Sequence, residues 1–265
     1  MRISLAFREE LPQRSFTVIA GSVFFLLFAL WCGLSYGKWV SEVFLPTPTA
    51  VLRALIELAR EQVLLQDIGI SNFRILVGFL LAVVISIPLG MLVGNLKVFE
   101  AALEPLIGFI RYMPVPAFIP LIMLYVGIGE EAKVLVIFIG VVVQMIIMVA
   151  DVTKQVSADL LKAALSLGAK PDEIFMKVIW KASLPGIFDV LRVNLGWAWT
   201  YLVVAELVAA NEGLGFRILK AQRFLKTDII FLYIFVIGLL GVIFDILFKM
   251  LHKRLFPWAQ ERLRG

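Results

Sequence analysis

Four polar side chains lie within otherwise apolar stretches of the sequence: Arg111, Gln144, Arg192 and Glu206. Ionisable groups are costly in apolar surroundings, so they usually face a cavity or a partner group. The planar guanidinium of arginine suits sulfonate, nitrate or carboxylate oxygens, and Arg111 or Arg192 would attract an anion. We predict that all four residues line a path for a small solute. The alternative is that each arginine pairs with a carboxylate or a carbonyl and holds helices in register.

Aromatic side chains accompany the two arginines. Tyr112 directly follows Arg111, and Trp197 lies one to two helical turns after Arg192. We include Tyr112 and Trp197 in the predicted path. The alternative is that they anchor span ends at a membrane interface, where Trp and Tyr are enriched.

The sequence offers little for catalysis. It contains no G-x-x-x-x-G-K-[ST] loop, so the chain cannot cradle nucleotide phosphates, and any ATP with its Mg²⁺ must be handled by a partner. The single Cys32 and the single His252 exclude an internal disulfide and a metal site built from the usual His and Cys ligands. We therefore predict that the protein is not an enzyme and holds no cofactor or metal.

The composition indicates an all-α integral membrane protein. Of its 265 residues 61% are hydrophobic and 17% are charged, whereas soluble domains carry about 25% charged residues. The mean hydropathy is +0.96. These values exclude a soluble enzyme, a disordered tail and a nucleic-acid-binding module. The net charge of +5 is then attributed to membrane topology.

Six apolar stretches have the length of about 20 residues that crosses a bilayer. They cover residues 16–36, 74–94, 105–126, 132–150, 186–208 and 229–251. We predict six transmembrane helices in a single domain, 1–265. Prolines in the third stretch interrupt the backbone ladder and mark it as an element of the path, or alternatively as an ordinary kinked helix.

An even number of spans places both termini on one side of the membrane. With the termini inside, the cytoplasmic segments hold more of the 25 Lys and Arg residues than the outer loops do, as the positive-inside rule requires. We predict cytoplasmic termini in a bacterial inner membrane.

A short amphipathic helix is predicted between the first two spans. Thr47 is its expected N-cap and Pro48 its first residue. Its apolar stripe would lie on the outer membrane surface or, equally, on the protein itself.

The cytoplasmic segment 151–185 forms the elbow, predicted as two short helices bent at a glycine. Ser157 caps the first helix, Gly168 ends it in a left-handed conformation, and Pro171 opens the second. Ile174 and Phe175 lie on the apolar side of the second helix. Such a face requires a partner surface.

The segment Lys162-Ala163-Ala164-Leu165-Ser166-Leu167-Gly168-Ala169, followed by Leu184-Pro185, resembles the E-A-A-x-x-x-G coupling loop of ATP-binding-cassette importer permeases. Lys162 stands at the acidic position. Further segments resemble the nitrate, sulfonate, taurine and bicarbonate subfamily. They are Leu45-Pro46-Thr47-Pro48, Arg111-Tyr112-Met113-Pro114-Val115-Pro116-Ala117, Gly127-Ile128-Gly129-Glu130, Leu202-Val203-Val204-Ala205-Glu206-Leu207 and Gly213-Leu214-Gly215.

The resemblance implies a type I importer permease that works as a homodimer. Two ATPase subunits would bind ATP and Mg²⁺, and an external substrate-binding protein would deliver a small anion. The residues implied to couple to the ATPase are Ala163, Ala164, Gly168, Ala169, Ile174, Phe175, Leu184 and Pro185.

Two alternatives remain from the sequence. The permease could carry a neutral or cationic vitamin precursor, since related permeases share the elbow. An ion-coupled secondary transporter would need no cytoplasmic partner, but the spans contain few carboxylates for a proton relay.

Overall fold

The computed structural model describes residues 12–259, which form helices and their connections only. The helices are α1 (Gln13–Tyr36), α2 (Pro48–Arg60), α3 (Val63–Asn95), α4 (Lys97–Ile110), the 3₁₀ turn η1 (Val115–Phe118), α5 (Ile119–Val126), α6 (Glu130–Lys154), α7 (Ala158–Ser166), α8 (Pro171–Glu173), the π-helical η2 (Ile174–Ile179), α9 (Trp180–Ala209), α10 (Leu214–Arg223), α11 (Thr227–Leu255) and the 3₁₀ turn η3 (Pro257–Ala259).

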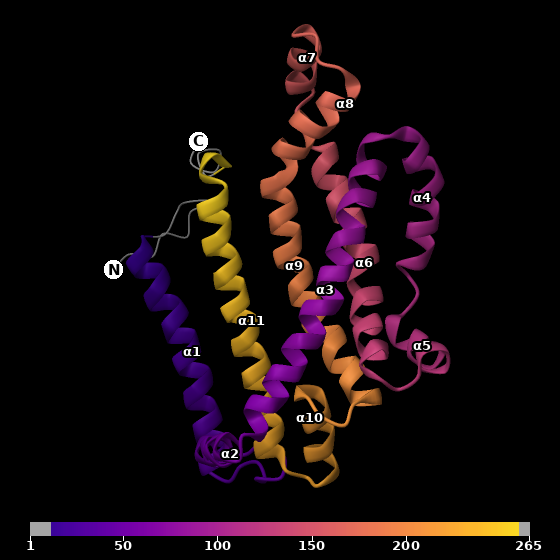
Figure 1. The fold of residues 1–265 in the computed structure, drawn as a ribbon. Helices are drawn as coiled ribbons and strands as arrows, with labels where there is room; N and C mark the ends of the chain where they lie inside the picture. Colours follow the sequence, from indigo (N-terminus) through magenta and orange to yellow (C-terminus); the bar gives the residue numbers. More distant parts are fainter. Residues whose placement is uncertain (1–11, 260–265) are drawn as a thin grey trace.

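The long helices run back and forth between two ends of the molecule (Figure 1). The first residues of α1 and the last residues of α11 lie toward the end that carries α7 and α8, and α2 and α10 lie at the opposite end. We call these the inner end and the outer end, following the predicted orientation. The common placement of these helix ends and the elbow is the one that six crossings require.

The predicted spans correspond to helices that differ in length and hydrophobicity. By length and composition, four helices of the described chain could each cross a membrane: α1, α3, α6 and α11. The bent pair of α4 with η1 and α5 would make a fifth crossing. The remaining prediction, 186–208, lies within α9, which at 30 residues is about 45 Å long. α9 is more polar than the others because it contains Asp189, Arg192 and Glu206.

The third predicted span is not one continuous helix. α4 ends at Ile110, and the axis turns by 87° before the chain continues through residues 115–126. Pro114 has an extended backbone (φ −68°, ψ 120°), and Pro116 lies in the 3₁₀ turn that follows. Proline removes a backbone donor and constrains the preceding residue away from the helical region. Of the two interpretations of these prolines, an ordinary kink is wrong, because the helix is broken.

The second elbow helix is not separate from the fifth span either. Pro171 opens α8 as predicted, but α8 continues through η2 directly into α9. The predicted boundary at residue 185 therefore falls inside a helix. Pro185 is an interior proline of this continuous helix, where its missing N–H leaves one carbonyl of the preceding turn without its usual helical partner.

α3, α6 and α9 form the centre of the bundle, and their facing side chains make up most of the core. The Ser86 hydroxyl of α3 donates a 3.0 Å hydrogen bond to the Val142 carbonyl of α6, and Ser86 is fully buried. A polar group in a membrane bundle is satisfied in this way across a helix pair. The core therefore positions α6 and α9 relative to α3.

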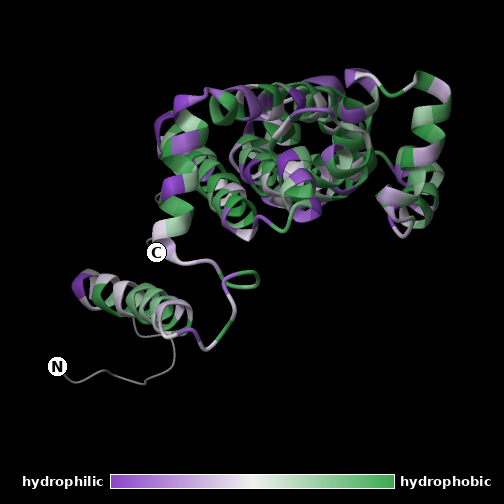
Figure 2. Cartoon of the chain, turned by 90° about the horizontal axis from the view of Figure 1, so that it is seen from below, coloured by the Kyte–Doolittle hydropathy of each residue, from purple (hydrophilic) through white to green (hydrophobic). Residues whose placement is uncertain are grey.

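α1 stands apart from this bundle (Figure 2). Its apolar stretch is not buried within the protein. It is held near its outer end, where the Trp31 ring stacks on Phe231 at 6.0 Å and the indole donates to the Pro46 carbonyl at 2.9 Å. The long apolar surface of α1 is therefore free to contact lipid or another protein.

α2 packs on the protein rather than lying free. The Thr47 side chain caps the helix by accepting from the Ala50 amide at 3.3 Å, as the sequence predicts. Val51 and Ala54 are buried, and the helix contacts α3 and α11. Of the two predicted positions of the apolar stripe, the structure therefore supports packing on the protein.

Candidate functional site

The break between α4 and α5 forms one wall of a cavity of about 640 Å³. The opposite walls come from the middle of α6 and α9. The lining is largely apolar and aromatic, and Arg111 is its one charged residue among the described part of the chain. The lining residues are Ile110, Arg111, Tyr112, Met113, Pro114, Val115, Pro116, Phe118, Ile139, Gly140, Val143, Gln144, Trp197 and Tyr201. Four of the six predicted path residues are thus brought together.

The Arg111 side chain is exposed and lies beside Tyr112. A guanidinium N–H donates to the Tyr112 hydroxyl at 2.7 Å, and the guanidinium carbon lies 4.7 Å from the centre of the same ring. Within residues 12–259 no carboxylate forms an ion pair with Arg111. Its charge and remaining N–H groups are therefore available to an anion in the cavity.

The other cavity walls are polar at one point and aromatic at two. Gln144 of α6 and Trp197 of α9 are both exposed, and Trp197 has 53% of its surface accessible. The Tyr201 ring lies against Gly140, where a Cβ atom would be only 2.4 Å from the ring. Gly140 therefore makes room for the Tyr201 ring at this wall, and a larger residue would displace it.

Arg192 lies outside this cavity, in a smaller cleft between α9 and α11. Its nearest carboxylate oxygens belong to Asp245 at 3.7 Å and Asp189 at 4.0 Å. The Asp189 carboxylate also lies 3.7 Å from the His252 imidazole. The position of Arg192 near Asp189 and Asp245 therefore agrees with the alternative interpretation, in which the arginine pairs with carboxylates and holds helices in register.

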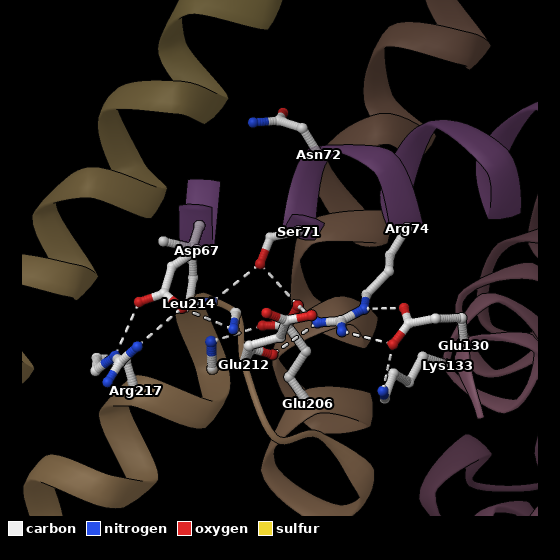
Figure 3. A network of polar contacts seen from close by, with 12 residues as sticks. Asp67, Ser71, Asn72, Arg74, Glu130, Lys133, Glu206, Glu212, Leu214 and Arg217 are labelled. Carbon is white, nitrogen blue, oxygen red and sulfur yellow. Dashed lines mark hydrogen bonds and ion pairs between the residues drawn. The ribbon is translucent and has the colours of Figure 1, made fainter. Parts of the chain in front are cut away.

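Glu206 also lies away from the cavity and is fully buried (Figure 3). One carboxylate oxygen accepts from the Ser71 hydroxyl and from the Arg74 guanidinium, both at 2.7 Å. The other oxygen accepts from the Gly215 amide at 2.7 Å. Glu206 of α9 therefore joins α3 to the first turn of α10.

Arg74 extends this cluster to α6. Two of its N–H groups donate to the two oxygens of Glu130 at 2.6 and 2.8 Å, a bidentate pairing that fixes orientation as well as charge. Lys133 adds a 2.6 Å ion pair to Glu130. Arg74 and Lys133 are both buried helical residues.

Asp67 anchors the other side of the same cluster. Its carboxylate accepts from the Gly213 amide at 2.9 Å, the Arg217 guanidinium at 2.8 Å and the Tyr233 hydroxyl at 2.7 Å. We call Asp67, Ser71, Arg74, Glu130, Lys133, Glu206, Arg217 and Tyr233 the outer cluster. Sequence reasoning found only Glu206 among them. A signal was present at the start of α3, where Asp67, Ser71 and Arg74 follow one another at spacings of four and three and so share one helix face.

The elbow lies at the inner end. Ser157 caps α7 by accepting from the Asp159 amide at 3.3 Å. Gly168 has φ +81°, as predicted, and the Ala169 amide reaches back to the Ala164 carbonyl at 3.0 Å. This is the bond pattern of a left-handed helix end. The first elbow helix is therefore confirmed.

The predicted coupling residues divide into exposed and packed ones. Ala163 and Gly168 are exposed, and Ile174 is buried. The remaining ones are half-buried against the core: Ala164, Ala169, Phe175, Leu184 and Pro185. The large apolar residues that the elbow exposes are Leu160, Leu165, Leu167 and Met176, and Leu167 is the most exposed at 89%.

One ion pair stabilises the helix that follows Gly168. The Lys177 ammonium donates to Glu173 at 2.7 Å. This hydrogen bond, together with one from the Lys170 amide, lowers the pKa of the Glu173 carboxyl below its usual value. Both side chains lie on the surface, where such a pair adds little stability.

No group of three or more His, Cys, Asp or Glu residues in the described chain is arranged to hold a metal ion. The cavity therefore depends on its arginine, its amide and its aromatic rings for any solute recognition.

Comparisons with known proteins agree with this architecture. Residues 86–257 match the model of the family described as binding-protein-dependent transport system inner membrane component. The chain is 34% identical to the taurine transport system permease protein TauC of Escherichia coli, over 94% of this chain and 92% of that one. It is 32% identical to the putative aliphatic sulfonates transport permease protein SsuC of Bacillus subtilis, over 89% and 86%. A solved inward-facing structure of the MetNI methionine ABC transporter contains a chain with a similar fold (TM-score 0.66, 19% identity, 72% and 95% covered).

Proposed function

Because the chain belongs to the family of inner membrane components of binding-protein-dependent transport systems, we propose that it is the permease subunit of an ATP-driven importer of small organic or inorganic anions. The substrate class is that of taurine and other sulfonates, nitrate or bicarbonate. The permease fold and its membership of the ABC transporter permeases are the premises from which this proposal starts.

The observation that carries the anion proposal is the exposed guanidinium of Arg111. It lies at the broken third span, in a cavity where no acidic side chain lines the wall. A positive group in a mostly apolar wall attracts an anion more strongly than it would in bulk water. Gln144 adds an amide that can donate to the same anion.

The elbow supports an ATPase partner. Leu165 and Leu167 are exposed beyond the membrane-spanning part of the bundle, where lipid cannot cover them. Large exposed apolar side chains in such a position favour a protein contact. In the proposal each of two ATPase subunits binds ATP and Mg²⁺ and receives one elbow.

A second copy of the chain completes the path. The cavity opens to the outside of the single chain, and Tyr112 and Trp197 are mostly exposed there. A homodimer encloses this surface and presents two elbows to two ATPases. The external substrate-binding protein docks at the outer end, around α10, and the assembly resides in a bacterial inner membrane with cytoplasmic termini.

The proposal is tested by reconstituting the purified chain in proteoliposomes with its ATPase subunits and binding protein. We expect uptake of radiolabelled taurine, an alkanesulfonate, nitrate or bicarbonate that depends on ATP and on the binding protein. Competition only by neutral or cationic compounds supports the vitamin-precursor alternative. Uptake that requires a proton or sodium gradient but no ATPase supports a secondary transporter and contradicts the proposal.

A further inference from the structure

The outer cluster contains charged side chains that do not line the proposed path. Its shortest contacts measure 2.6–2.8 Å, and Arg74 and Glu206 have no exposed side-chain surface. Removing such groups from water is costly and is offset only by close pairing and full hydrogen bonding. A cluster of this kind in a membrane bundle therefore requires a role that apolar packing alone does not supply.

The cluster joins five elements at one place, because Tyr233 of α11 also donates to Asp67, at 2.7 Å. Arg74 of α3 contacts both Glu130, the first residue of α6, and Glu206, near the end of α9. It also donates to the Glu212 carbonyl at 2.8 Å. Three consecutive amides, those of residues 213–215, donate to Asp67, Ser71 and Glu206 (Figure 3). The outer ends of α3, α6, α9, α10 and α11 are thereby held together.

The middle of α9 packs against α6 in the core, but its side toward α11 is held less tightly than its outer end. Arg192, about 21 Å along the helix from Glu206, has only contacts of 3.7 and 4.0 Å to carboxylates that are themselves partly exposed. A cleft of about 200 Å³ separates this part of α9 from α11. α9 therefore has room to move against α11.

Two unsatisfied polar atoms lie in the same region. The Asn194 side-chain oxygen and the Trp199 indole N–H are buried, and neither has a hydrogen-bond partner in the described chain. Buried polar groups are normally paired, so each exception points to strain, bound water or a second arrangement of the structure. Both atoms belong to α9, and Trp199 also lines the cleft toward α11.

We propose that Arg74 and Glu206 are positioning residues for transport, which fix the outer ends of α3, α6, α9 and α10 as one rigid body about which the inner part of α9 swings. α9 continues without interruption from the elbow through η2 to Glu206. In this role, which rests on the proposed function, a displacement of the elbow by the ATPase tilts α9 into the cleft beside α11. The outer cluster prevents α9 from sliding along its own axis independently of α3, α6 and α10.

The test uses the complete reconstituted complex, with radiolabelled taurine as probe, and measures ATP hydrolysed per taurine imported. In Glu206→Gln the amide presents both a donor and an acceptor, so either Arg74 or the Gly215 amide faces a second donor. We expect the ratio to rise about fivefold or more, the lower end of typical coupling between sites. Arg74→Lys should act in the same direction, because one ammonium cannot replace the guanidinium fork.

Glu100→Gln is the matched control. Glu100 pairs with Lys97 and Lys154 at the inner end, at 2.7 and 2.8 Å, so its loss removes an ion pair without touching the outer cluster. We expect an unchanged ratio. Ser71→Ala is a milder variant that removes only the hydroxyl between Glu206 and the Leu214 amide. If Glu206→Gln does not assemble, the ratio of ATP hydrolysed to taurine imported in Ser71→Ala tests the role of the outer cluster.

Hydrogen exchange of the amides of residues 213–215 reports whether the cluster has been opened. The proposal is overturned if these amides exchange faster in Glu206→Gln or Ser71→Ala while ATP per taurine stays at the wild-type value. It is equally overturned if Glu100→Gln uncouples as strongly. A wild-type complex that imports none of taurine, an alkanesulfonate, nitrate and bicarbonate in an ATP-dependent manner would instead contradict the proposed function.

Discussion

The Arg111 guanidinium is available because no carboxylate pairs with it, although Glu104 and Asp151 line an adjacent cleft with it. It donates to Tyr112 and forms no ion pair with a carboxylate of the described residues, whereas Arg74 and Arg217 are both paired with carboxylates. Arg111 thus differs from Arg74 and Arg217 in its charge pairing because its neighbours differ. In the proposed function, the charge at Arg111 attracts the anionic solute.

Replacing Arg111 tests this assignment. We expect Arg111→Lys to insert and assemble normally but to lower uptake about tenfold, or ~1.4 kcal/mol, because an ammonium lacks the planar fork. Uptake per assembled complex is the measurement. Arg53→Lys, on the exposed face of α2, is the control. Normal transport by Arg111→Lys combined with failed assembly of Arg111→Met would assign Arg111 a structural role.

Gly168 provides a second test at the same scale. A Cβ atom there would meet no neighbour within 4 Å, so only the backbone conformation at φ +81° opposes substitution. A non-glycine residue in this conformation costs about 1–2 kcal/mol, asparagine least. We therefore expect uptake to fall in the order Asn, Ala, Val at position 168, with membrane insertion unchanged. Equal uptake by the Asn and Val variants would contradict the elbow's need for this bend.

Among the elements, the elbow and the broken third span differ in what stabilises them. α7 ends through local backbone bonds, whereas the break after α4 is sheltered by a small apolar cluster that includes Ile119, Ile122 and Ala205. The elbow is therefore a local structure whose outer surface is exposed. The break depends on α6 and α9 for its shape.

The exposed surface of the elbow predicts where the ATPase binds. Leu167→Asp should reduce co-purification of the ATPase, because a carboxylate would be desolvated in the contact. Leu225→Asp at the outer end is the control, since Leu225 is 69% exposed and has φ +53°, which aspartate tolerates better than leucine. Full retention of the ATPase by Leu167→Asp, measured by quantitative pull-down, would remove Leu167 from the docking surface.

For the whole molecule, the distribution of exposed apolar surface indicates which parts are complete. The α3, α6 and α9 core is well buried, but α1 and the cavity side of α4 and α5 are open. Lipid can cover an apolar helix, but it does not solvate an exposed guanidinium at the cavity. A second copy of the chain can enclose water and solute at the cavity, so that the Arg111 guanidinium remains solvated.

Mass measurement of the detergent-solubilised complex checks this assembly. We expect two copies of the chain with two ATPase subunits, because two enclosed cavities and two elbows then meet a pair of nucleotide sites. Quantifying each subunit in the same complex gives the ratio independently of bound detergent. A complex with one copy that still imports substrate would contradict the homodimer.

The sequence by itself determined most of the apolar helices, the membrane class and the caps. Apolar runs, Thr47, Ser157 and Gly168 act within a few residues of the chain, so their consequences can be recognised without knowing the fold. The polar residues at odds with apolar spans could also be identified as important. Their partners could not.

Only the tertiary structure decided which of those residues meet. Arg74 and Glu206 are 132 positions apart, and a pairing over that distance depends on which faces of α3 and α9 pack together. The same packing placed Arg111, Gln144 and Trp197 around one cavity and left Arg192 outside it. Hydrophobicity is non-directional and drives the helices into the membrane. The angle between α4 and α5 follows from how the side chains of neighbouring helices pack. The same packing decides which charged residues of different helices lie opposite one another.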